Sequence, residues 1–306
     1  MGAVATCALL AGCGGGASVG QTAHEGGVLS GGVLPAQAAI RSIASTASQN
    51  VVYIGNISSP PGSGEVFVYP AGVGDKNPAL IRTITNGTRR PSGLWVDAKG
   101  TLYVANIPDG AASIGITEFH AGASSPFRTL NGDLTYPEAV AVGPDGTVYV
   151  NNSVTLQGGD GDLLTVFPPN STHPSHAIEI PNSGYAFNAG ELAFAHDGDL
   201  LAIGTSFTHG THVFDVNTTT FQASEVPLDL TNVQGPGLAV DSTGNIYISG
   251  DADDGIEVFS GTTFKVIRKI PDGAFYMYFS PDDTMYADLG DGVAEYLRGA
   301  QQPANV

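Results

Sequence analysis

The sequence predicts an all-β fold in which six four-stranded antiparallel blades form a ring, that is, a six-bladed β-propeller. The composition is the first reason: among 306 residues there are 42 Gly and 19 Pro, and the apolar runs are short and rich in Val, Ile, Tyr and Phe. Such runs are typical of strands joined by tight turns. The second reason is an internal repeat with a period of roughly 40 to 50 residues, which is the length of a propeller blade.

The repeat consists of an apolar run, a turn and a second apolar run. Its best copies are Leu94–Asn106, Val140–Asn152 and Leu238–Gly250, its weaker copies are Leu192–Leu201 and Met277–Tyr286, and a half copy is Val51–Asn56. The aligned positions are Tyr53, Tyr103, Tyr149, Leu201, Tyr247 and Tyr286, at separations of 50, 46, 52, 46 and 39 residues. Six copies predict six blades, which must stack in a ring because no blade buries both faces alone.

Each full copy is interpreted as the first two strands of a blade, A and B. The Asp and the Gly between them supply the local hydrogen bond and the positive φ that a tight reversal needs. We therefore expect Asp97, Asp145 and Asp241 to be turn residues without a functional role.

Further apolar segments follow most of these pairs and predict the outer strands, C and D. The expected C strands are Glu65–Tyr69, Thr117–Phe119, Leu164–Phe167, His212–Phe214, Ile256–Phe259 and Ala294–Tyr296. The expected D strands are Leu80–Ile84, Phe127–Leu130, Ala177–Ile180 and Val266–Ile270.

Blade six lacks an evident fourth strand, because only a polar tail follows Tyr296. In one interpretation Ala39–Ile43, which resembles the other D strands, completes this blade. Ile43 is only ten residues before Tyr53, however, which is short for a crossing loop and an inner strand of blade one. The alternative makes residues 40–47 that inner strand and Val28–Leu34 the outer strand. We expect the N-terminus to close the ring and leave both alternatives open.

Both cysteines, Cys7 and Cys13, precede the repeats. Leu9–Cys13 resembles the lipobox of bacterial lipoproteins, in which the Cys receives lipid, although no Lys or Arg precedes it, as in a truncated signal peptide. We expect a signal peptide at 1–13, a flexible Gly-rich tether at 14–38, the propeller at 39–298 and a C-terminal tail at 299–306. The resemblance implies an extracytoplasmic protein, lipid-anchored through Cys13 to a bacterial membrane, in the periplasm or at the cell surface.

The run Pro-x-Gly-Leu-x-Val-Asp-x-x-Gly-x-Leu-Tyr-Val-Ala-Asn in Pro91–Asn106 resembles the repeat of NHL-type propellers. Gly235–Leu238 begins the next best copy, and the resemblance covers most of residues 50–298. That repeat family includes signalling scaffolds, extracellular binding modules and enzymes such as the senescence-marker/gluconolactonase group. The resemblance therefore implies the fold and leaves the activity open.

In an antiparallel meander the A strands begin, and the B strands end, on the same face of the ring. The candidate ligand-binding residues on that face are Ser92, Asn106, Glu138, Asn188 and Glu191. Glu138 and Glu191, from blades three and four, are candidates for an acid–base pair or for ligands of calcium or magnesium. The alternative is that both carboxylates are solvated or satisfy strand ends. His212 is a further candidate for catalysis beside Glu191.

Two further metal candidates, Asp251 and Asp253, lie in Asp251–Gly255, which resembles half of a calcium loop but is also a plausible acidic turn. The gluconolactonase group implies a metal held by Glu, Asn and Asp, and Glu138 and Asn188 fall near comparable places. This sequence lacks the Leu-Gly-Glu-Gly-Pro opening of that group and has Pro236 where an Asp is expected. A metal-dependent lactonase site would therefore be a variant one.

The net charge of −18, without a basic cluster, argues against nucleic-acid binding. The sequence also lacks a Gly-x-Ser-x-Gly elbow, a phosphate loop and a dinucleotide fingerprint. The first hypothesis is a monomeric binding module that presents its loops to a protein, a glycan or a small ligand and contacts the membrane only through its lipid. The second is a metal-dependent hydrolase, lactonase or lyase with its site in the central funnel. We favour the first.

Overall fold

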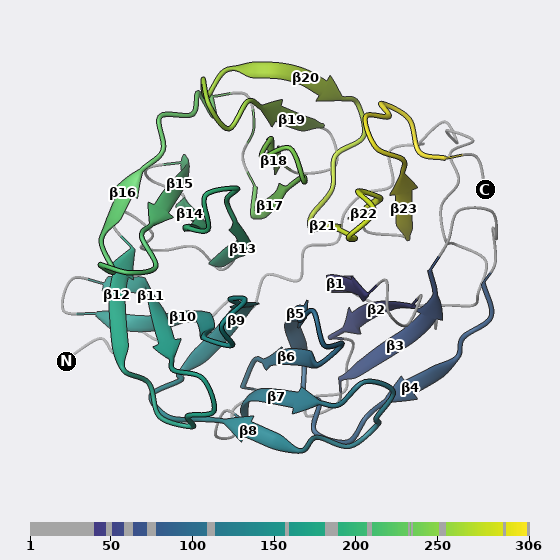
Figure 1. Cartoon of the computed structure of the whole chain (residues 1–306), viewed down its shortest axis with the longest axis vertical. Coiled ribbons are helices and arrows are strands. Elements are labelled where there is room, and N and C mark those ends of the chain that lie inside the picture. The colour runs from purple at the N-terminus through teal and green to yellow at the C-terminus, as the bar shows by residue number, and fades with distance from the viewer. Residues whose placement is uncertain are drawn as a thin grey trace, which may run out of the picture.

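The computed structural model describes residues 40–46, 51–57, 64–71, 78–108, 114–156, 159–180, 189–206, 210–231, 233, 235–250, 255–289 and 292–304. Its strands form six antiparallel sheets arranged in a ring (Figure 1). In the described part of the chain, five sheets have four strands and one has three. The predicted six-bladed propeller is confirmed. Over the same residues, no helix has the length and apolar character needed to cross a membrane.

The first three blades follow one another along the chain. Blade one comprises β1 (Ile40–Thr46), β2 (Val51–Asn56), β3 (Glu65–Pro70) and β4 (Arg82–Ile84). Blade two comprises β5 (Pro91–Val96), β6 (Leu102–Asn106), β7 (Gly115–Phe119) and β8 (Arg128–Leu130). Blade three comprises β9 (Tyr136–Val142), β10 (Val148–Leu156), β11 (Gly159–Phe167) and β12 (His176–Ile180).

The other three blades continue in the same order. Blade four comprises β13 (Ala189–Phe194), β14 (Leu200–Ser206), β15 (Gly210–Val216) and β16 (Ala223–Glu225). Blade five comprises β17 (Gly237–Val240), β18 (Ile246–Ser249), β19 (Ile256–Phe259) and β20 (Val266–Ile270). Blade six comprises β21 (Met277–Phe279), β22 (Met285–Asp288) and β23 (Val293–Tyr296). The sequence did not predict β16, because Ala-Ser-Glu lacks the apolar residues of the other D strands.

The strand register confirms the repeat alignment. In every blade, the aligned residue of the B strand pairs with the equivalent residue of the A strand. The pairs are Ala44 with Tyr53, Trp95 with Tyr103, Ala141 with Tyr149, Ala193 with Leu201, Ala239 with Tyr247 and Tyr278 with Tyr286. All six blades therefore present equivalent positions to the centre of the ring.

The A–B turns have the predicted chemistry. Asp97 accepts hydrogen bonds from the backbone N–H groups of Lys99 (2.9 Å) and Thr101 (2.8 Å). Asp241 accepts the equivalent bonds in blade five, and Asp145 accepts one in blade three. Gly100 closes the turn of blade two at a φ of 82°, a conformation that costs glycine little. These bonds confirm that the three Asp residues are turn residues.

The structure decides between the two interpretations of residues 40–47. β1 pairs with β2 and is the inner strand of blade one, so the assignment of Ala39–Ile43 to the fourth strand of blade six is wrong. The physical reason is the short connection: only residues 47–50 separate β1 from β2, which suits a hairpin between neighbouring strands. Val28–Leu34, the outer strand of the alternative, lies outside the described residues.

Each pair of neighbouring blades shares a hydrophobic core. The core between blades six and one contains Tyr286 and Val293 from one side and Val52, Ile54, Phe67 and Tyr69 from the other. Burial of this apolar surface stabilises the closed ring by about 25 cal/mol per Å². Blades one and six therefore meet face to face, as the other neighbouring blades do.

Candidate functional site

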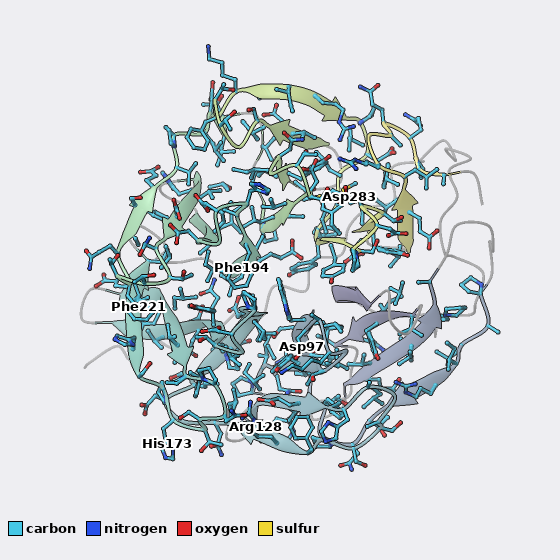
Figure 2. The ribbon with its side chains drawn as sticks, in the orientation of Figure 1. Asp97, Arg128, His173, Phe194, Phe221 and Asp283 are labelled. Carbon is cyan, nitrogen blue, oxygen red and sulfur yellow. The ribbon has the colours of Figure 1, made fainter. Side chains whose placement is uncertain are left out.

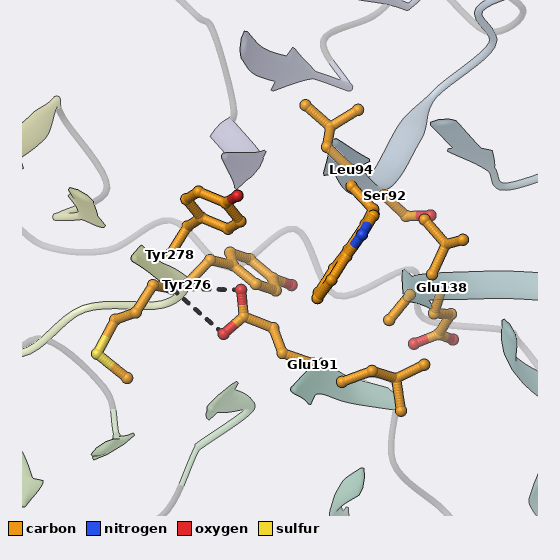
Figure 3. Close-up of a pocket in the computed structure, with 12 residues that line it drawn as sticks. Ser92, Leu94, Glu138, Glu191, Tyr276 and Tyr278 are labelled. Atoms are coloured by element: carbon orange, nitrogen blue, oxygen red, sulfur yellow. Dashed lines mark hydrogen bonds between the residues drawn. The ribbon is translucent and has the colours of Figure 1, made fainter. Parts of the chain in front are cut away.

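A pocket lies at the centre of the ring on the face where the A strands begin (Figure 3). Its volume is about 40 Å³, and residues of blades two, three, four and six line it. The lining side chains with chemical functionality are Ser92, Trp95, Glu138, Glu191, Tyr276 and Tyr278. The structure thus brings Ser92, Glu138 and Glu191, three of the predicted site residues, to one pocket.

Glu191 connects three blades. Its carboxylate accepts hydrogen bonds from the backbone N–H groups of Leu238 in blade five (2.8 Å) and Met277 in blade six (3.2 Å to each oxygen). Its own backbone N–H donates to the carbonyl of Pro236 at 3.1 Å. The side chain therefore accepts from N–H groups at the starts of two neighbouring A strands, which is a structural role.

The protonation of Glu191 is unusual. Burial of the carboxyl group raises the pKa of Glu191 well above its usual range. The bonds from Leu238 and Met277 oppose this rise, and the negative charge of Asp288 adds to it. Because burial dominates, the site favours the protonated acid more than water does.

Glu138 and Glu191 share the pocket but do not face each other. Figure 3 shows the carboxylate of Glu191 turned toward the strand that carries Tyr276 and Tyr278, while Glu138 lies on the opposite side. Glu138 is 9 % exposed. Ser92, beside it, donates its hydroxyl hydrogen bond to the carbonyl of Pro137 at 2.9 Å and so joins blades two and three.

Aromatic rings from alternate blades meet at the axis. Trp95 of blade two contacts Phe194 of blade four edge to face, with centroids 5.8 Å apart, and Tyr278 of blade six, with centroids 6.5 Å apart. The sequence analysis did not identify Trp95 or Tyr278. A signal was present: these two stand at the A-strand position that holds Ala in the other four blades.

Asn106 lies at the end of β6 and serves the fold. Its amide nitrogen donates to the carbonyls of Val104 (2.9 Å) and Gly115 (3.0 Å). Its amide oxygen accepts from the backbone N–H of Arg89 at 2.7 Å. Asn106 is fully buried and does not line the central pocket.

His212 lies on β15, away from the residues that line the central pocket. Its Nδ1 is 2.6 Å from a carboxylate oxygen of Glu225. The two residues line a separate pocket of about 310 Å³, which the connection after β16 completes. The structure therefore does not place His212 beside Glu191.

Four predicted residues lie outside the described part of the chain: Asn188, Asp251, Asp253 and the lipidation candidate Cys13. Their roles stay predictions. Among the described residues, no group of three or more His, Cys, Asp or Glu side chains is arranged to hold a metal ion.

The comparisons with known proteins agree with this architecture. A family model described as a beta-propeller repeat matches residues 229–257, which include β17 and β18. No curated protein matches the chain.

Solved structures match over most of the chain. A chain of hydrazine synthase from Kuenenia stuttgartiensis is 17 % identical, with a TM-score of 0.61 over 85 % of this chain and 84 % of that one. A gluconolactonase from Xanthomonas campestris is 15 % identical, with a TM-score of 0.62 over 88 % and 86 %. A putative gluconolactonase is 14 % identical, with a TM-score of 0.63 over 87 % and 89 %. At these identities the likeness establishes the fold alone.

Proposed function

We propose that this protein is a propeller module outside the cytoplasm, anchored to a bacterial membrane through Cys13, whose pocket face binds another protein. The bonds of Glu191 carry the binding-module part of the proposal. Glu191 of the pocket holds the starts of two neighbouring A strands, so it is used to build a rigid face. A carboxylate with these bonds has less capacity left for a metal or a reacting group.

The size of the pocket favours a partner protein over a free small molecule. Sites for small molecules usually enclose about 300 to 1,000 Å³. The central pocket, of about 40 Å³, holds a few water molecules or one small chemical group. Such a group is best supplied by a side chain that projects from a larger partner.

Photocrosslinking in cells tests this proposal. A photoreactive amino acid is introduced either on the face with the pocket or on the opposite face, and the crosslinked adducts are compared. Thr135, exposed just before β9 on the pocket face, is one position, and Lys99, exposed in an A–B turn on the opposite face, is the matched control. We expect a discrete crosslinked adduct from position 135 and none from position 99. Glu138→Gln, in the pocket, should reduce the adduct. Equal adducts from both faces, or none from position 135, would contradict the proposal.

The anchor needs its own test. With a complete signal peptide, the protein should fractionate with membranes, and Cys13→Ala should release it into the soluble fraction. Unchanged fractionation of Cys13→Ala would remove the lipid anchor from the proposal and leave the binding face untouched.

A metal-dependent hydrolase, lactonase or lyase is the second candidate. It is favoured by one observation: Glu138 and Glu191 line one pocket of a fold shared with two proteins named as gluconolactonases. Calcium, magnesium or manganese would then stabilise the folded protein by about 2.7 kcal/mol at a hundredfold excess over Kd. Glu138→Gln combined with Glu191→Gln should abolish that shift. The binding module predicts no shift with any of the three ions.

A further inference from the structure

The connection between blades four and five is longer than the equivalent connections after β4, β8 and β20. It spans residues 226–236, whereas the other three span residues 85–90, 131–135 and 271–276. Two hydrogen bonds tie it to β15. The backbone N–H of Val226 donates to the carbonyl of Val213 at 2.8 Å. The backbone N–H of Gly235 donates to the hydroxyl of Thr211 at 3.3 Å. Connections held on a rigid scaffold in this way often carry a binding site.

The extra residues complete the pocket of about 310 Å³ that His212 lines. One wall of this pocket is apolar. Val213 and Val226 are buried there, and Leu228 and Leu230 pack against the core between blades four and five. The volume lies in the usual range for small-molecule sites, about 300 to 1,000 Å³, unlike that of the central pocket. Because D strands end on the face where A strands begin, both pockets lie on the same face of the ring.

The other wall of the pocket carries two carboxylates. An oxygen of Glu225 is 2.6 Å from Nδ1 of His212. Oδ1 of Asp229 accepts hydrogen bonds from the backbone N–H (3.3 Å) and the hydroxyl (2.8 Å) of Thr231. An ionised carboxylate has about four acceptor sites, so both groups keep capacity for a ligand. Among the described lining residues none is Lys or Arg, and the two carboxylates therefore face at most the one positive charge of an imidazolium.

We infer that this pocket binds a small organic cation, namely a primary ammonium group on a short alkyl chain. The ammonium group donates charge-assisted hydrogen bonds to Glu225 and Asp229, and the alkyl chain lies against Leu228 and Leu230. The net charge of −18 favours the approach of a cation. In the described part of the chain, His, Asp and Glu side chains are not arranged to hold a metal ion, so N–H donors match the acidic wall better.

A titration of the isotopically labelled protein with pentylammonium chloride, followed by NMR, tests this inference. We expect saturable shifts of the backbone signals of His212, Asp229 and Thr231. The matched probe is 1-pentanol, which keeps the chain and a hydrogen-bond donor but carries no charge. It should bind about tenfold more weakly, since a hydrogen bond to a charged group contributes more than a neutral one. Equal binding of the two probes, or shifts confined to other residues, would overturn the inference.

A pair of variants tests the contribution of the pocket itself. Asp229→Asn should weaken the binding of pentylammonium about tenfold. The control is Asp197→Asn, which changes the net charge equally. Asp197 is exposed in the A–B turn of blade four, on the opposite face, and accepts a similar bond from the backbone N–H two residues later. This variant should bind as the parent does. Equal weakening in both variants would mean that overall charge, not this pocket, attracts the cation.

Either a free amine or a lysine side chain of a partner protein can supply the ammonium group. The photocrosslinking experiment at position 135 separates these sources. If a partner supplies the group, Asp229→Asn should reduce the adduct, whereas with a free amine the adduct should be unchanged. Both results agree with an ammonium site, which the pentylammonium titration decides. A protein that binds pentylammonium but yields no adduct would contradict the partner-binding function and leave this site in place.

Discussion

The A–B turns on one face of the ring repeat the same bonds in several blades, whereas the A strands on the opposite face begin with a different side chain in each blade. Asp97 and Asp241 each hold two backbone N–H groups within their own turn. Ser92 and Glu191 instead form hydrogen bonds to other blades. The difference shows that repeated residues build each blade, while unrepeated ones join the blades and shape the pocket.

Among substitutions of the residues that join the blades, we expect the largest loss of stability at Trp95, on the axis of the ring. Trp95→Ala removes the ring that contacts Phe194 and Tyr278 and leaves a cavity, so we expect a loss of about 3 kcal/mol in the free energy of unfolding. Trp95→Phe keeps an aromatic ring and should cost about 1 kcal/mol. Chemical denaturation measures both. A cost below about 1 kcal/mol for Trp95→Ala would mean that the central rings contribute little.

We expect the next largest loss of stability from substitutions of Glu191. Glu191→Ala leaves the N–H groups of Leu238 and Met277 without their acceptor, which should cost about 2 kcal/mol. Glu191→Gln keeps an acceptor oxygen and should cost less than about 1 kcal/mol. If the two variants were equally stable in urea denaturation, the bonds between blades would not be what Glu191 provides.

Substitution of the Asp residues in the A–B turns should cost less stability, and by a similar amount in blades two and five. Asp241→Ala removes the bonds to Thr243 and Asn245, and we expect a loss of about 1 kcal/mol. Asp97→Ala should cost a similar amount in blade two, because it removes the equivalent pair of bonds. Clearly unequal losses, measured by denaturation of both variants, would show that the blades do not use the turn alike.

The smallest expected effect is on the pH dependence of stability. Asp241, on the face of the A–B turns, and Glu191, on the face of the pocket, should contribute to it in opposite directions. Burial acts to raise the pKa of Asp241, but hydrogen bonds from Thr243 and Asn245 outweigh it and lower the pKa. Its contribution is therefore present above the unfolded pKa, about 3.9, and is lost as the pH falls through the folded pKa. Burial raises the pKa of Glu191, so its contribution is present below the unfolded pKa, about 4.3, and is lost as the pH rises through the folded value.

Substitution identifies each contribution. In unfolding experiments between pH 3 and pH 8, Glu191→Gln should remove part of the decline toward neutral pH, and Asp241→Asn should remove part of the decline toward acid. An unchanged profile in Glu191→Gln would mean that this carboxyl group does not titrate differently in the folded and unfolded states.

Much of the fold could be predicted from the sequence because the turn chemistry is local. In blades two and five an Asp accepts hydrogen bonds from the backbone N–H groups two and four residues later, so the turn leaves a signal in the sequence. Local turn chemistry could not decide whether the N-terminal segment is an inner or an outer strand. Ile40–Ile43 has the pattern of Ile81–Ile84, and only the pairing with β2 shows that it is an inner strand.

Less of the site could be predicted. Meander topology places Ser92, Glu138 and Glu191 on one face, and all three line the pocket. The bonds from Glu191 to Leu238 and Met277 depend on how three blades meet, which no local pattern encodes. The ligand-binding roles of the predicted residues stay predictions.

The aromatic contacts at the axis also determine how the pocket exchanges its contents. Because the rings of Trp95, Phe194 and Tyr278 meet near the centre of the ring, we expect a partner group to reach the pocket from the face where the A strands begin. Figure 2 shows Phe194 near the middle of the ring. Entry and release then share a single path, so a partner group seated in the pocket must leave before solvent or a competitor can enter. Competitors should accordingly lower the association rate of the partner without accelerating its dissociation.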